Sequence, residues 1–138
     1  MINFNNLNCT SCPAIHLRDL QRIEKVERMR WQALERLKDK TACIILLCES
    51  TPARVFVYDP GTNSKLRKNL REELVPGKSD DDLFNYMNSQ RIWIVDCALC
   101  PVHLLKSNTD KRCAATICLE RHTSAYLQAQ KKAKSVIQ

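Results

Sequence analysis

Glycine is scarce in this chain. Only two of the 138 residues are glycine, whereas average usage of about 7% would give roughly ten. This scarcity excludes collagen-like and Gly/Ser-linker proteins, and it argues against a phosphate-binding loop built on clustered glycines. Hydrophobic residues make up 44% of the chain, which excludes a disordered low-complexity protein and is enough for a packed core. At this length we expect one domain.

Long apolar runs and a leader sequence are also lacking. The longest apolar run, residues 42–48, is far shorter than the ~20 residues of a membrane helix. Residues 1–12 contain neither the basic region nor the apolar region of a signal peptide. We therefore expect a soluble cytoplasmic protein with no membrane partner. In that compartment eight cysteines are reduced, buried or bound to metal rather than paired in disulfides.

Positive charge is concentrated toward the end of the chain. The formal net charge is +7, and residues 106–138 carry seven Lys and Arg against two Asp and Glu. Such a surplus favours contact with a polyanion such as DNA. The alternative is a set of solvated helix faces that only keep the protein soluble.

Apolar periodicity predicts an α/β fold. Residues spaced three or four apart predict amphipathic helices at 15–39, around 66–74, after a cap at Ser79, and from about 113. Short, continuously apolar runs predict buried parallel strands at 42–48 and 92–95, and residues 134–138 resemble the start of a third. We expect a three-layer αβα arrangement with a short parallel sheet.

This alternation also predicts the organisation of the chain. Residues 1–138 form one domain, with a cysteine-containing segment at 1–14 and an α/β core at 15–138. A stable parallel sheet usually has four or more strands. We therefore expect either that the chain is the N-terminal portion of a longer domain or that a partner completes the sheet.

An acidic residue follows each of the two clear strands. Glu49 comes after the first strand and Asp96 after the second. Ligands of open α/β sheets bind beyond the carboxyl ends of the strands, so we expect both carboxylates to face one cleft. There Glu49 would serve as a general base and Asp96 would accept hydrogen bonds from a ligand. The alternative is that Glu49 caps a helix or loop and that Asp96 accepts hydrogen bonds from backbone N–H groups.

These segments resemble the uracil-DNA glycosylase superfamily. The resemblance is carried by Leu-Cys-Glu-Ser-Thr-Pro at 47–52, Val-Phe-Val-Tyr at 55–58 and Ile-Trp-Ile-Val-Asp-Cys-Ala-Leu-Cys-Pro-Val at 92–102. The resemblance is closest to prokaryotic members that have a Glu-Ser-Pro-Pro loop, and it covers about residues 40–128. It implies a DNA-repair hydrolase that removes a flipped-out base from DNA by cleaving the N-glycosidic bond.

The resemblance assigns roles to four residues. Glu49 matches the residue that positions the attacking water, and Phe56 or Tyr58 matches the aromatic residue that stacks on the base. Asp96 stands where the family often has an Asn that reads uracil. A carboxylate can only accept hydrogen bonds and leaves the uracil O4 unmatched, which argues against uracil as the base that is read.

The cysteine spacing predicts a metal centre. Cys9 and Cys12, like Cys97 and Cys100, form Cys-x-x-Cys pairs that can together bind zinc. The resemblance to the iron–sulfur branch of the superfamily implies a [4Fe–4S] cluster on a different set, with two open choices for the last two ligands. The set is Cys9, Cys12, Cys100 and Cys118, with Cys97 and Cys113 as the alternative final pair.

We expect the remaining cysteines and the histidines to have structural roles rather than to bind metal. Cys43 and Cys48 lie on or beside a strand, so we expect both to be buried apolar residues. The three histidines show no fixed relation to the cysteines and are expected at the surface or in the core. Two functions follow from the sequence: a DNA glycosylase, or a non-catalytic domain stabilised by zinc or an iron–sulfur cluster that binds nucleic acid or protein.

Overall fold

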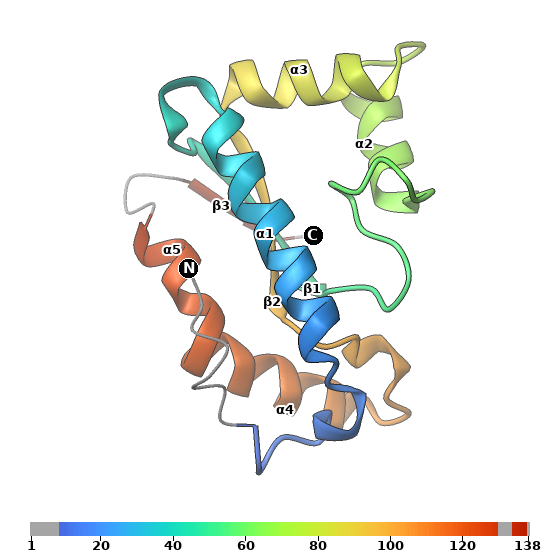
Figure 1. Ribbon diagram of the computed structural model, residues 1–138, viewed down its shortest axis with the longest axis vertical. Coiled ribbons are helices and arrows are strands. Elements are labelled where there is room, and N and C mark those ends of the chain that lie inside the picture. The colour runs from blue at the N-terminus through green and yellow to red at the C-terminus, as the bar shows by residue number, and fades with distance from the viewer. Residues whose placement is uncertain (1–8, 130–133, 138) are drawn as a thin grey trace.

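The computed structural model describes residues 9–129 and 134–137 and has an α/β fold (Figure 1). Helices alternate with short parallel strands, as the apolar periodicity predicts. The elements in chain order are α1 (Leu20–Arg36), β1 (Ile44–Ser50), α2 (Lys65–Leu74), α3 (Asp80–Gln90), β2 (Ile92–Ala98), α4 (Asn108–Cys118), a π-helix (Leu119–Thr123), α5 (Ser124–Ala129) and β3 (Lys134–Ile137).

The sheet is parallel and has the strand order β2-β1-β3. Leu46 of β1 lies opposite Ile94 of β2 on one side and Val136 of β3 on the other. The third strand that residues 134–138 predicted is therefore present over Lys134–Ile137. This order places β1 in the middle of the sheet.

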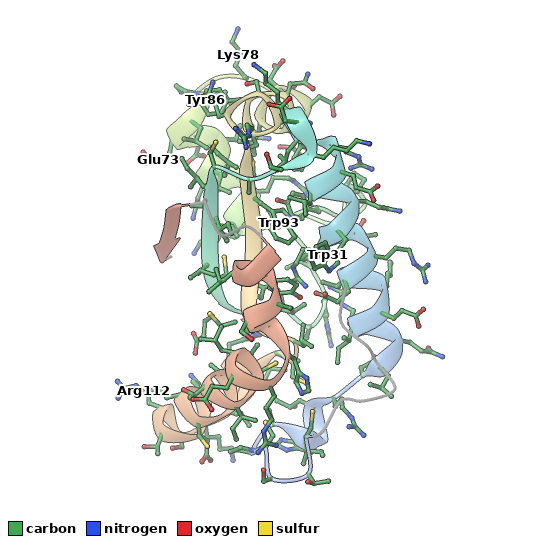
Figure 2. The ribbon with its side chains drawn as sticks, turned by 90° about the vertical axis from the view of Figure 1, so that its left-hand side faces the viewer. Trp31, Glu73, Lys78, Tyr86, Trp93 and Arg112 are labelled. Atoms are coloured by element: carbon green, nitrogen blue, oxygen red, sulfur yellow. The ribbon has the colours of Figure 1, made fainter. Side chains whose placement is uncertain are left out.

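Helices cover both faces of the sheet and one edge of it. On one face Leu83 and Met87 of α3 pack with Ile94 of β2. On the other face Tyr126 of α5 packs with Trp93 of β2. Helix α1 lies beside β2 on the side away from β1, and Trp31 and Trp93 meet in this contact (Figure 2). The three layers thus leave the carboxyl ends of β1 and β2 at one end of the molecule.

Side-chain caps explain where the helices begin. Asp19 accepts a hydrogen bond from the Arg22 backbone N–H and starts α1, so the predicted helix over 15–39 is shorter than expected. A separate 3-10 turn, Ile15–Leu17, precedes it. Ser79 and Asp82 form a capping box at the start of α3, which confirms the predicted cap.

The last helical segment differs from the prediction in two ways. It begins at Asn108, where Ser107 supplies the cap, rather than near residue 113. It is also interrupted by the π-helix before α5 begins. In the described part of the chain, no helix has both the length and the apolar character needed to cross a membrane.

Candidate metal centre and strand-end residues

Four of the eight cysteines line one small cavity. Its walls include Cys9, Cys12, Cys100 and Cys118, together with His122, around a space of about 20 Å³. The thiols come from both ends of the described chain, and they are the four that the resemblance to the iron–sulfur branch implied. The alternative pair is not part of this cavity.

Local backbone geometry positions each thiol. The Cys12 N–H donates to the Cys9 carbonyl at 2.9 Å, which closes the Cys-x-x-Cys turn. Cys100 follows the end of β2, where its carbonyl accepts from the Val102 N–H at 2.8 Å. Cys118 is the last residue of α4, and its Sγ accepts from the Leu99 N–H at 3.3 Å.

Burial keeps two of these thiols neutral. It raises the pKa of Cys100 to about 11, and neighbouring Cys9 and Cys12 raise it further while Arg18 lowers it. Burial also raises the pKa of Cys118 to about 12, against the lowering effect of its hydrogen bond from Leu99. Neighbouring thiolates repel one another, so the thiols lose their protons only when a positive charge lies among them. A bound metal cation would supply that charge.

The donor chemistry of the cavity fits a metal ion, although the side chains are not yet arranged as ligands. In the described residues, no group of three or more Cys, His, Asp or Glu side chains forms a metal site as it stands. The four thiols nevertheless border one space of about the volume of a water molecule.

Cys97 and Cys113 lie elsewhere. Cys97 is the last residue but one of β2, and Cys113 is exposed on α4. Because Cys97 is held in extended backbone, Cys97 and Cys100 do not form the compact turn that a chelating Cys-x-x-Cys needs. The structure therefore does not bring Cys97 and Cys100 together as one chelating pair, and it does not place Cys97 and Cys113 in the cavity with Cys9 and Cys12.

The two cysteines expected in the core differ from each other. Cys48 is half-buried against the α3 side of the sheet, and burial raises its pKa to about 12. Cys43 is exposed, which contradicts the expectation of burial. It precedes β1, and its N–H bonds the Arg91 carbonyl, so its backbone is anchored while its side chain faces solvent.

Asp96 belongs to a buried charge network. It is 4% exposed and forms an ion pair with Arg30 of α1, whose other guanidinium nitrogen pairs with Glu27. The Thr51 hydroxyl donates to Asp96 Oδ2 at 3.1 Å. The network extends to Tyr126, whose hydroxyl donates to Glu27. The carboxylate of Asp96 is thus bound by the side chains of Arg30 and Thr51, and not by the backbone N–H groups that the alternative for this residue predicted.

The aromatic candidates are enclosed as well. Phe56 is 2% exposed, and the Arg30 guanidinium lies over its ring, 5.2 Å from the centroid. The Tyr58 hydroxyl accepts from the Ile94 N–H at 2.9 Å. Tyr58 also lines a cavity of about 190 Å³ beside Ala33 and Phe84.

Glu49 and Asp96 do not share a face of the sheet. Asp96 lies opposite Cys48 in the parallel register, and successive side chains of a strand point to opposite faces. Glu49 is therefore on the face away from Asp96, and it is exposed. The strands are neighbours as expected. The expectation that both carboxylates face one cleft is wrong, because the two side chains point to opposite faces of the sheet.

A second cavity lies at the carboxyl ends of β1 and β2. Its volume is about 200 Å³, and its lining includes Arg22, Thr51, Pro52 and Cys100. Arg22 donates to the carbonyls of Pro52 at 3.4 Å and Val55 at 3.1 Å. Arg22 therefore fixes the loop that follows β1.

Sequence reasoning missed Arg22, Arg30 and Glu27. Residues 23, 26, 27, 30, 33 and 34 of α1 are all buried, so Glu27 and Arg30 stand within the apolar stripe of that helix. Two charged residues inside an apolar stripe are the signal that could have revealed the network, because buried charges occur in pairs.

A cationic groove occurs at the start of α2. It measures about 280 Å³ and is bordered by Lys65, Lys68, Arg67 and Arg71, with Asp80 as the acidic residue. Asp80 pairs with Arg67 at 3.1 Å and with Arg71 at 2.6 Å. The two lysines are exposed, so the groove keeps a positive surplus beside a helix N-terminus.

Comparison of the chain with protein-family models, with curated proteins and with solved structures gave no significant match.

Proposed function

We propose that this chain is a DNA-binding α/β domain of the uracil-DNA-glycosylase type that carries a metal centre. The observation that carries the proposal is the assembly of Cys9, Cys12, Cys100 and Cys118 around one cavity. These cysteines are up to 109 residues apart in the sequence, and the motifs of the resemblance lie between them. Zinc or an iron–sulfur cluster would tie the N-terminal segment to the end of β2.

Charge supports DNA as the partner. The net charge is +7, and the groove at α2 presents Lys65 and Lys68 to solvent next to the N-terminus of that helix. Phosphate groups favour such a combination of lysines and helix N-terminus. Arg112 of α4 points outward at the other end of the molecule from Glu73 of α2 (Figure 2).

The activity we propose is hydrolysis of an N-glycosidic bond, with Glu49 orienting the water. The water oxygen bonds to the sugar carbon, the bond to the base breaks, and the base leaves with the electron pair. Glu49 is exposed near the carboxyl end of β1, where a ligand of an α/β sheet binds. A positioned carboxylate accepts the proton that the attacking water loses.

The test compares Glu49→Gln with Glu72→Gln on a panel of oligonucleotides that each contain one modified base. We expect the parent to release a base from at least one of them, and Glu49→Gln to lose more than about 99% of that rate. Glu72 is exposed on α2, so its variant should retain the parental rate. Full activity of Glu49→Gln on every cleaved substrate would exclude the proposed role.

A second candidate function is DNA binding without base excision. It is favoured by the pairing of Asp96 with Arg30 and by the enclosure of Phe56, because neither residue offers a free group to a flipped base. This candidate predicts DNA binding and bound metal but no base release from any oligonucleotide of the panel. Fluorescence anisotropy with the same oligonucleotides measures the binding.

A further inference from the structure

His122 lines the same cavity as the four cysteines. It is the fourth residue of the π-helix that directly continues α4. The Thr123 hydroxyl donates to the Cys97 carbonyl at 2.8 Å and to the Cys118 carbonyl at 3.4 Å. These two bonds attach the π-helix to the end of β2, and so they hold the backbone of His122 beside the cavity.

The spacing of Cys118 and His122 suits chelation. The two residues are four apart on a continuous helical segment, so their side chains lie on the same side of it. Helical ligand pairs of structural zinc sites have three to five intervening residues, and the partner pair is a Cys-x-x-Cys turn. Cys9 and Cys12 provide that turn.

The volume of the cavity favours one ion. The space between the side chains is about 20 Å³, which is close to the volume that holds a single water molecule. A zinc ion with ligands at about 2.0–2.3 Å fits such a space after side-chain rotation. A cluster of four irons and four sulfides is several times larger than a single ion and needs correspondingly more room.

Cys100 differs from the other thiols because it borders two cavities. It lines the metal cavity and also the cavity at the carboxyl ends of β1 and β2. A tetrahedral ion needs only four of the five donors. Cys100 stands on the wall between the two spaces, so it is the thiol most easily left out.

We propose that the cavity binds one zinc ion through Cys9, Cys12, Cys118 and His122, with Cys100 as a neighbouring thiol that is not a ligand. This inference rests on the metal centre of the proposed function and names its ion and ligands. The ion replaces the protons of three thiols, which pass to solvent, and takes the lone pair of one neutral imidazole nitrogen.

X-ray absorption at the zinc edge tests the ligand set on the whole chain loaded with zinc. We expect one zinc per chain with three sulfurs at about 2.3 Å and one nitrogen at about 2.0–2.1 Å. Cys100→Ser and His103→Ala should leave that spectrum unchanged; His103 is exposed on a different segment. His122→Ala should lose the nitrogen ligand and bind zinc at least about tenfold more weakly.

His122→Cys guards against loss of folding in the alanine variant. It should keep one zinc per chain and give a shell of four sulfurs. A four-sulfur shell in the parent that Cys100→Ser destroys and His122→Ala preserves would overturn the inference while the four-cysteine centre stands. Absorbance near 400 nm with stoichiometric iron would overturn the single zinc ion. Failure of the chain to bind any metal would overturn the metal centre itself.

Discussion

Arg30 connects three separate elements through its side chain. It pairs with Glu27 on its own helix and with Asp96 on β2, and it donates to the Tyr126 hydroxyl on α5 at 3.1 Å. Its guanidinium also lies over the rings of Phe56 and Tyr126. A single cation therefore pairs with two buried carboxylates and lies against two aromatic rings.

Removing this cation should destabilise the fold strongly. Arg30→Met keeps most of the volume but leaves two buried carboxylates without a counter-charge, which costs about 3–5 kcal/mol of unfolding free energy. Arg28→Met is the control because Arg28 forms an exposed pair with Glu24 at 3.0 Å, worth less than about 0.5 kcal/mol. Urea denaturation measures both, and equal losses would contradict the role of the network.

Thiol reactivity should follow exposure and pKa. Cys43 and Cys113 are exposed, whereas burial raises the pKa of Cys48 and Cys118 to about 12. At pH 8 we expect iodoacetamide to modify Cys43 and Cys113 first, because the thiolate is the reacting form and buried thiols remain protonated. Peptide mass spectrometry follows the order, and early modification of Cys48 would show that the strand is more open than described.

The π-helix depends on one hydroxyl. Thr123 is 1% exposed and bonds two carbonyls, one on β2 and one on α4. Thr123→Val preserves the shape but removes the donor, so the variant should lose about 1–2 kcal/mol of unfolding free energy. Thr123→Ser keeps the hydroxyl and should recover most of this loss. Thermal unfolding of the two variants distinguishes the hydrogen bond from simple packing.

Helix α3 depends on its capping box. Ser79→Ala removes the side-chain acceptor of the Asp82 N–H, and this should cost about 1 kcal/mol. The hydrogen bonds from Ser79 lower the pKa of the Asp82 carboxyl below its ordinary value of 3.8. The carboxylate therefore stabilises the fold above pH 3.8, and this contribution is lost as pH falls through the lowered pKa.

Acid titration of the folded protein checks the direction of that effect. The parent should lose stability more steeply below pH 3.8 than Ser79→Ala does, because the variant lacks the hydroxyl that donates to the charged carboxylate, although the backbone N–H of residue 79 still donates to it. Asp82→Asn should show a still flatter dependence, because it removes the titrating carboxyl itself. A parent and a variant with parallel acid profiles would contradict the capping box as the cause.

The sequence predicted the elements better than their side-chain directions. The runs at 42–48 and 92–95 identify β1 and β2 because buried parallel strands are continuously apolar. The same pattern does not reveal that Glu49 and Asp96 point to opposite faces, since that depends on the register between the strands. The π-helix was also missed, because a bonding pattern longer by one residue leaves no apolar period to detect. The cysteine set followed from the resemblance, whereas His122 required the fold.

The charge of the whole molecule should control the DNA binding that we propose. Affinity should fall as salt rises, because each lysine that contacts a phosphate displaces a counterion. Replacing Lys65 and Lys68 by Gln should reduce the slope of log affinity against log salt by up to about two. Replacing Lys38 and Lys40, which are exposed after α1, removes the same charge as a control. Identical slopes in the two double variants would exclude the groove at α2 as the contact.

The placement of α1 determines which edge of the sheet can accept another strand. Along the outer side of β2, the Ile94 N–H already donates to Tyr58, and α1 packs beside the strand (Figure 2). On the opposite side, no strand among the described residues pairs with the outer edge of β3. A further strand, supplied by more of the same polypeptide or by another molecule, can therefore be added only at β3. That asymmetry makes β3 the position at which to introduce a charge or a proline if self-association has to be suppressed.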